Sequence, residues 1–322
     1  MKRVWWVHLI GWLSLGGMAV LLTIYSIRET YVHHPVLSIL KVMLLVGITF
    51  SIYREARVIG EPHVRTRFQL SDLYDFLGVI IGALVTFMLQ TELGLHAVAA
   101  SAVVGLAGGM FLKPVGAALF CGSFVGMASP GMFCFLPGVV LSSCIAALLF
   151  VITRELYPGI GGKLGTKAFF GCLAGSWILG FEGMADPVPG WDAGILILVC
   201  SVLGAVGTFL LHHRMSLGPV IASSLVGLVS VISLPLLFQD IGLMLAVITF
   251  CASFAGMASR IRFPSYWEIG IGGLLCGLLF IFTAPHLGGA GGKLGTIAFA
   301  SLLGLLGWKH LAEYFRELIH SR

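Results

Sequence analysis

A nine-residue sequence occurs twice in this chain with a single difference. Residues 161–169 read GGKLGTKAF, and residues 291–299 read GGKLGTIAF, 130 positions later. A second pair keeps the same spacing without a gap: FCGSFVGMAS at 120–129 and FCASFAGMAS at 250–259. Self-similarity at a fixed spacing is the mark of an internal structural repeat. We therefore expect one duplicated domain, preceded by an N-terminal addition.

An earlier block extends the similarity between the two copies. Residues 82–106 align without a gap to 204–228, here at a spacing of 122, and Phe87 and Phe209 are among the shared positions. The second copy therefore carries an insertion between this block and the later ones. Two units of about 100 residues account for most of the chain. We predict repeat one at 72–190, repeat two at 191–308, an N-terminal segment at 1–71 and a C-terminal segment at 309–322.

The composition indicates whether these repeats fold in water or in a membrane. Hydrophobic residues make up 58% of the chain and charged residues only 10%, whereas about a quarter of the residues in a soluble domain are charged. Apolar runs near the ~20 residues that a membrane-spanning helix needs recur along the sequence, and the alternating pattern of barrel strands is absent. The sequence predicts an all-α polytopic membrane protein. Its net charge of +5 reflects charges in loops and does not indicate nucleic acid.

The apolar runs predict twelve transmembrane helices, two before the repeats and five in each repeat. The third run of each repeat is short, so it either crosses the membrane or re-enters it. If both cross, every Lys and Arg except Arg28, Lys41 and Lys293 lies on the N-terminal side, and the positive-inside rule favours that arrangement. Both termini are then cytoplasmic, in the cytoplasmic (plasma) membrane. The predicted spans are 4–27, 35–53, 73–89, 95–112, 114–128, 136–152, 164–181, 195–211, 217–238, 241–258, 266–282 and 294–308.

This count of spans has a consequence for the orientation of the repeats. Five spans, an odd number, separate Lys163 from Lys293, so the two repeats are expected to be inverted with respect to each other. Lys163 then lies on the cytoplasmic side and Lys293 on the outer side. Inverted repeats are the architecture of many secondary transporters, and some channels share it. The polar and apolar faces of 309–322 predict an amphipathic helix on the cytoplasmic surface.

The GGKLGT sequence begins the fifth span of each repeat, where it suggests contact with an anion. A helix N-terminus offers unpaired N–H groups and a positive dipole end, and the neighbouring lysine adds a full charge. The alternative is that the glycines allow close helix packing and that Lys163 is an ordinary cytoplasmic lysine. A nucleotide-binding P-loop is excluded because Leu164 and Leu294 follow the lysines, where Ser or Thr is required.

The FCxSFxGMAS sequence ends the short third span, and short, glycine-interrupted spans at matching positions in two repeats point to a central site. The alternative is that its Ser and Gly residues are small contacts between helices. Phe124, Phe254, Met127 and Met257 then serve in packing or form an apolar constriction. The predicted solute-binding residues are Gly161, Gly162, Lys163, Gly165, Thr166, Gly291, Gly292, Lys293, Gly295, Thr296, Ser123, Gly126, Ser129, Ser253, Gly256 and Ser259.

The sequence offers no evident catalytic chemistry. No nucleophile with a base and a carboxylate, no metal-ligand spacing and no carboxylate in the middle of a span stands out. The seven cysteines fall in or beside apolar runs, where they indicate small buried side chains and neither disulfides nor zinc. We therefore expect no enzyme activity, no catalytic residues, no metal and no cofactor.

These features favour a transporter of a small anionic solute, with the two GGKLGT helix starts facing a central site. Two alternatives stay open: a channel or facilitator with a static pore, and a membrane-embedded structural subunit of a larger complex. The five-plus-five plan resembles several transporter and channel groups in architecture alone. Expected partners are the solute and membrane lipids, without nucleic acid; a homo-oligomer or a partner subunit is left open.

Overall fold

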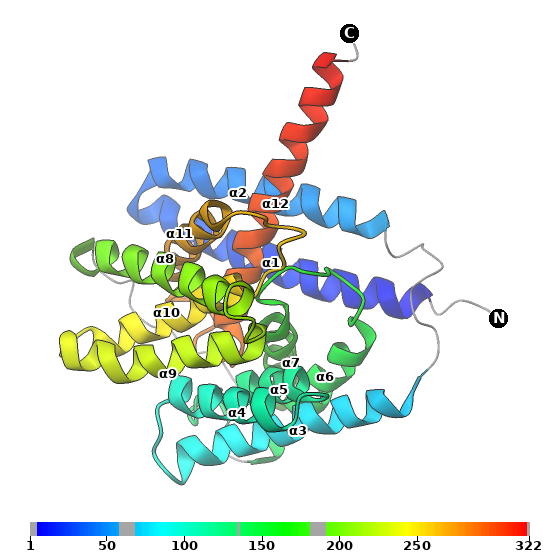
Figure 1. Cartoon of the computed structure of the whole chain (residues 1–322), viewed down its shortest axis with the longest axis vertical. Helices are drawn as coiled ribbons and strands as arrows, with labels where there is room; N and C mark the ends of the chain where they lie inside the picture. The colour runs from blue at the N-terminus through cyan, green and yellow to red at the C-terminus, as the bar shows by residue number, and fades with distance from the viewer. Residues whose placement is uncertain (1–4, 58–67, 134–135, 181–190, 321–322) are drawn as a thin grey trace.

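The computed structural model describes residues 5–57, 68–133, 136–180 and 191–320, and this part of the chain forms twelve helices and no strand (Figure 1). Most of the predicted loop between Arg54 and Ser71 lies outside these residues, as does the predicted boundary between the repeats at 181–190. The helices are α1 Trp5–His33, α2 Pro35–Glu55, α3 Leu70–Thr91, α4 Ala97–Phe111, α5 Gly116–Gly126, α6 Leu136–Ile152, α7 Lys163–Leu179, α8 Trp191–His213, α9 Pro219–Leu237, α10 Gly242–Gly256, α11 Tyr266–Thr283 and α12 Lys293–His320.

Seven of the described helices, α1, α2, α3, α8, α9, α11 and α12, are long and apolar enough to cross a membrane. Large apolar side chains lie exposed along them, for example Val36 at 82% and Ile195 at 69%. A protein surrounded by water rarely exposes so many, whereas lipid tails accept them without penalty. The predicted all-helical membrane protein agrees with this arrangement.

Four further helices, α4, α5, α6 and α10, are apolar but shorter than a full span. Helix α5 ends at Gly126 and α10 ends at Gly256, which confirms the breaks that the short third runs predict. A Cβ atom at Gly126 would collide with the Ala83 carbonyl of α3, and one at Gly256 would collide with the Ala205 carbonyl of α8. Glycine therefore allows α5 to lie flat on α3 and α10 to lie flat on α8.

Hydrogen bonds recur at the two predicted repeat spacings. In each set, a serine of α4 or α9 bonds to a serine of the helix that follows, α5 or α10. The cysteine two residues before that second serine donates to a leucine carbonyl in a GGKLGT segment. The bonds join Ser101 to Ser123 (2.8 Å), Ser223 to Ser253 (2.7 Å), Cys121 Sγ to the Leu164 carbonyl (3.2 Å) and Cys251 Sγ to the Leu294 carbonyl (3.1 Å).

The two GGKLGT segments meet where α7 and α12 cross. A Cβ atom added to either Gly165 or Gly295 would lie 2.6 Å from the Cα atom of the other, so the two backbones touch. Gly162 (φ 83°) and Gly292 (φ 84°) precede these helices in the left-handed conformation that glycine adopts without strain. The repeated sequences are therefore brought together at the first turns of two helices.

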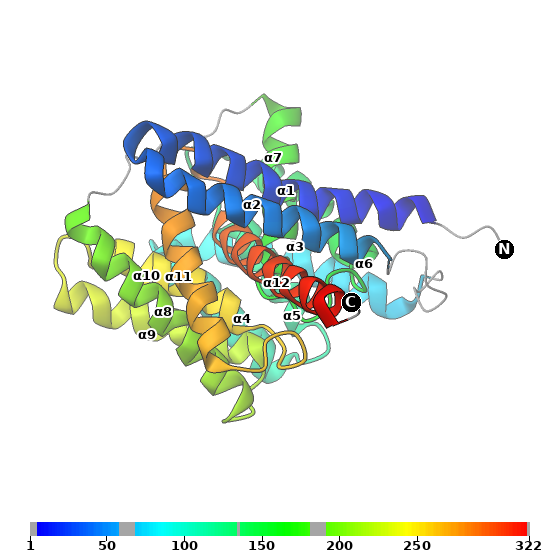
Figure 2. The ribbon, with the colours of Figure 1, turned by 90° about the horizontal axis from the view of Figure 1, so that it is seen from above.

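The N-terminal helices α1 and α2 lie side by side (Figure 2); α1 contacts α11 and α12, and α2 contacts α12. Helix α2 approaches α12 closely because glycines face one another at Gly47, Gly304 and Gly307. Helix α12 continues without a break through residues 309–320, so the predicted amphipathic segment forms its last turns. Figure 1 shows these turns projecting beyond the rest of the ribbon.

Candidate functional site

The two GGKLGT segments line two cavities of unequal size. The larger has a volume of about 550 Å³ and is lined by residues 288–295, together with the beginning of α4 and the ends of α5 and α11. The smaller has a volume of about 150 Å³ and is lined by residues 159–165, together with the beginning of α9 and the end of α10. Each cavity thus gathers equivalent segments of the chain.

Single residues of the two linings also correspond. Met127 lines the larger cavity and Met257, 130 positions later, lines the smaller. Ala97 lines the larger and Pro219, 122 positions later, lines the smaller. Both offsets are those of the sequence repeat. The linings of the two cavities therefore contain residues related by the spacings of the sequence repeat, and the cavities differ in volume.

Four phenylalanines, Phe120 and Phe124 of α5 with Phe250 and Phe254 of α10, pack together beside both cavities. The ring centroids of Phe124 and Phe254 lie 4.8 Å apart, and the two rings line both cavities. Phe120 and Phe250 are 6.3 Å apart and fully buried. A cluster of buried rings between two cavities has the composition of an apolar constriction.

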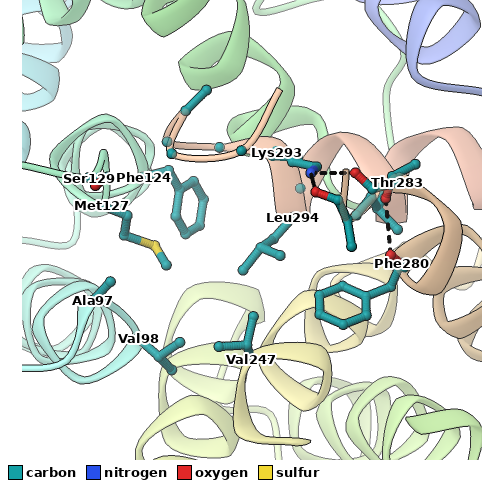
Figure 3. A pocket seen from close by; sticks show the side chains of 18 of the residues that line it. Ala97, Val98, Phe124, Met127, Ser129, Val247, Phe280, Thr283, Lys293 and Leu294 are labelled. Atoms are coloured by element: carbon teal, nitrogen blue, oxygen red, sulfur yellow. Dashed lines mark hydrogen bonds between the residues drawn. The ribbon is translucent and has the colours of Figure 1, made fainter. Parts of the chain in front are cut away.

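The walls of the larger cavity are mainly apolar (Figure 3). The close view shows side chains of α4, α5, α10 and α11 surrounding the space, with Leu294 directed toward it. A volume of this size falls in the range of small-molecule sites, which combine apolar walls with a few polar groups. The apolar side chains are Val98, Phe124, Met127, Met244, Val247, Phe254, Phe280, Leu294 and Ile297.

Both lysines of the GGKLGT segments donate to backbone carbonyls, Lys293 at the end of α11 and Lys163 in the turn that follows the end of α6 at Ile152. Lys293 Nζ lies 2.6 Å from the Thr283 carbonyl and 3.5 Å from the Ala284 carbonyl (Figure 3). Lys163 Nζ lies 2.7 Å from the Leu156 carbonyl and 3.2 Å from the Arg154 carbonyl. Carbonyls near a helix C-terminus lack partners within the helix, and a lysine satisfies them. Each ammonium thus has a structural role beside its cavity.

His96 is the other ionisable side chain that lines the larger cavity. It caps α4, because its Nδ1 accepts the Val98 N–H at 3.3 Å. Accepting this bond requires that Nδ1 carry no proton. Among the described residues, no carboxylate lines either cavity. Lys293 and Lys163 are therefore the residues with a charged group in the described linings of the larger and the smaller cavity, respectively.

Comparisons with protein-family models, curated proteins and solved structures give no match for this chain. The function is accordingly argued from the two cavities.

Nine of the predicted solute-binding residues line the cavities. The larger cavity is lined by Ser129, Gly291, Gly292, Lys293 and Gly295, and the smaller by Gly161, Gly162, Lys163 and Gly165. The others serve in packing or local hydrogen bonds: Ser123 and Ser253 are buried between helices, Gly126 and Gly256 contact α3 and α8, Thr166 and Thr296 bond to the carbonyls of Gly162 and Gly292, and Ser259 N–H donates to the Gly159 carbonyl.

Sequence reasoning missed two kinds of residue at the site. Phe120 and Phe250 line neither cavity but pack against Phe124 and Phe254, and both open the FCxSFxGMAS sequence, so the repeat itself contained the signal for the ring cluster. His96, Met244 and Phe280 carry no such mark, because they reach the larger cavity only when α4, α10 and α11 assemble around it.

Arg262 lies beside Gly159, one of the residues that line the smaller cavity, and makes two polar contacts with distant segments. Its Nη1 lies 2.7 Å from Glu55 Oε1 of α2, and its Nε donates to the Pro158 carbonyl at 3.2 Å. The residue 130 positions before Arg262 is Met132, and the residue 130 positions after Pro158 is Gly288. A methionine side chain makes no such ion pair. The ion pair of Arg262 with Glu55 therefore has no counterpart at the equivalent position beside the larger cavity.

Proposed function

We propose that this protein is a membrane transporter of a small anionic solute, built as two inverted repeats at 72–190 and 191–308. In this proposal all twelve helices cross the membrane or enter it from one side, both termini are cytoplasmic, and Lys163 and Lys293 face opposite compartments of the plasma membrane. The paired hydrogen bonds and the crossing of α7 and α12 at Gly165 and Gly295 support the inverted arrangement.

One observation carries the transport proposal: equivalent cavities of about 550 and 150 Å³ lie beside the same pair of rings, Phe124 and Phe254. Two repeats of the same plan can exchange conformations at little net cost in free energy. In each state of the protein one repeat has the first conformation and the other repeat has the second, so the two states contain the same conformations. Exchange would enlarge the smaller cavity and shrink the larger one. A solute held beside the rings would then pass from one side to the other.

The anionic character of the solute is supported by the charges near the cavities. A lysine stands beside each cavity, and among the described residues no carboxylate lines either one. The N-termini of α12 and α4 also begin at the larger cavity, where their dipoles favour negative charge. The apolar walls favour an organic anion over a small inorganic one, because an inorganic anion gains nothing from apolar contact.

The test is transport by the purified full-length protein in liposomes. A panel of labelled organic anions and size-matched neutral solutes is offered outside, with the unlabelled compound inside at high or zero concentration. A transporter that alternates between two states is expected to take up at least one anion faster when the same compound is present inside. Uptake that is insensitive to the internal solute indicates a static pore, and absence of uptake across the panel contradicts the proposal.

A further inference from the structure

A third cavity, remote from the two described above, lies between the ends of α2 and α12. Its volume is about 500 Å³. One wall is formed by Phe50, Tyr53 and Arg54 of α2 with Arg57 just beyond that helix, and the other by Glu313, Tyr314 and Glu317 of α12. We name this space the α2–α12 groove.

The groove exists because the two helices touch at one place and then diverge. Gly47 of α2 packs against Gly304 and Gly307 of α12, and Trp308 Nε1 donates to the Met43 carbonyl at 2.7 Å. Beyond this contact the last turns of α12 project away from the other helices (Figure 1). The two helix ends therefore enclose an angle that no other described helix fills.

The two walls of the groove carry opposite charges. Arg54 and Arg57 are exposed on the α2 wall, and Glu313 and Glu317, four positions apart, share one face of α12. Among the described residues, no ion pair joins one wall to the other, and Glu313 instead contacts His310 of its own helix. The charges thus face a common space and leave it open to a ligand.

The surroundings of the groove indicate a lipid. Tyr53 and Tyr314 are 62% and 55% exposed, and aromatic residues of this kind are enriched at the level of lipid headgroups. Along α2, Met43 and Val46 are 45% and 48% exposed, so an apolar surface adjoins the charged groove. A headgroup in the groove would have its acyl chains beside this surface.

We propose that the α2–α12 groove binds the headgroup of a zwitterionic aminophospholipid, phosphatidylethanolamine. Arg54 and Arg57 bind its phosphate, since guanidinium groups match phosphate oxygens in charge and geometry. Glu313 and Glu317 bind its ammonium. An anionic lipid such as phosphatidylglycerol satisfies the arginines but leaves the two carboxylates without a cation, and the trimethylammonium of phosphatidylcholine donates no hydrogen bond to them.

The experiment measures lipid binding to the purified full-length protein in detergent by native mass spectrometry. Phosphatidylethanolamine, phosphatidylglycerol and phosphatidylcholine with identical acyl chains are titrated separately. We expect the wild type to bind phosphatidylethanolamine about fivefold more tightly than the other two. The double variant Glu313→Gln/Glu317→Gln is expected to lose this preference and to bind phosphatidylglycerol at least as well, whereas Arg54→Gln/Arg57→Gln is expected to weaken both.

A matched control removes one exposed arginine and one exposed glutamate elsewhere, in Arg28→Gln/Glu92→Gln, which should keep the wild-type preference. The proposal is overturned if the wild type does not distinguish the three lipids, or if the Glu313→Gln/Glu317→Gln variant keeps its preference for phosphatidylethanolamine. Folding of each variant is checked by its elution and thermal midpoint, because all four groove positions lie near the ends of helices where substitution leaves the packed interior intact.

Discussion

Lys293 combines a charge beside the larger cavity with a fixed position. The Thr283 and Ala284 carbonyls hold its ammonium, so under the proposed function an anion in the cavity would be attracted by the charge without displacing those bonds. Glutamine retains a donor for one carbonyl and removes the charge. The residue therefore separates an electrostatic role from a purely structural one.

We expect Lys293→Gln to weaken binding of anionic solutes and to leave neutral solutes unaffected. For an anion on the order of 8 Å from the ammonium at an effective dielectric of about 20, the lost attraction is roughly 2 kcal/mol, or about thirtyfold in affinity. Solute concentration at half-maximal uptake in liposomes measures this. Lys163→Gln is the matched variant. We expect it to lower the affinity for the anion less when the solute enters from the side of the larger cavity. Unchanged affinity for every transported anion would contradict the anionic assignment.

At the scale of helices, the crossing of α7 and α12 is the contact that fixes both GGKLGT segments. An added methyl at Gly165 meets the backbone of Gly295, which cannot rotate away as a side chain can. Glycine is required here by packing, whereas Gly207 of α8 has no atom within 4 Å of an added Cβ. The two positions thus form a natural pair for comparison.

Gly165→Ala is expected to destabilise the protein, because overpacking against a fixed backbone costs about 1–3 kcal/mol or more. Gly207→Ala is expected to be neutral or to stabilise, since alanine is favoured over glycine within a helix by roughly 1 kcal/mol. Thermal unfolding of the purified variants in detergent provides the measurement. Equal midpoints for the two variants would show that α7 and α12 do not pack as described.

Arg262 connects three elements, since it joins the loop before α11 to α2 through Glu55 and to the segment before α7 through Pro158. Its loss is expected to loosen closure around the smaller cavity. We predict that a cysteine in place of Met257, in the lining of that cavity, reacts several-fold faster with a thiol reagent in an Arg262→Met background. The double change Glu55→Gln/Arg262→Met avoids leaving a buried carboxylate unpaired.

The comparison variant for this measurement places a cysteine at Met127, in the larger cavity. It should react readily in the wild-type background and should not become faster when Arg262 is replaced. If the Met257→Cys rate is the same with and without Arg262, the arginine has no part in closing the smaller cavity.

At the scale of the whole molecule, the proposed inverted arrangement predicts which side of the membrane each repeat's lysine faces. Glu155 and Pro285 are equivalent positions, 130 residues apart, near Lys163 and Lys293. In intact cells, a membrane-impermeant thiol reagent should label Pro285→Cys, whereas Glu155→Cys should become labelled only after the membrane is opened. The wild type provides the background from native cysteines. Labelling of both variants from the same side would exclude inverted repeats.

The sequence by itself determined that the protein folds in a membrane, where its helices lie and which repeated segments come near the cavities. Its low content of charged residues indicated a membrane protein, and its apolar runs located helices such as 136–152 to the residue. Its short third runs located the helix ends at Gly126 and Gly256. These properties depend on neighbours in the chain: burial of consecutive apolar residues and the freedom of glycine. For the same reason the GGKLGT sequences were recognised as paired helix starts.

Only the tertiary structure decided what faces the cavities. Ser123 and Ser253 were candidates by sequence, yet they lie between helices, whereas Phe280 was unmarked and lines the larger cavity. The direction of the lysine ammonium groups also depends on where α6 and α11 end in space. Two nearly identical sequences surround cavities of unequal volume, and the ion pair between Arg262 and Glu55 joins segments so distant in the chain that it leaves no local pattern in the sequence.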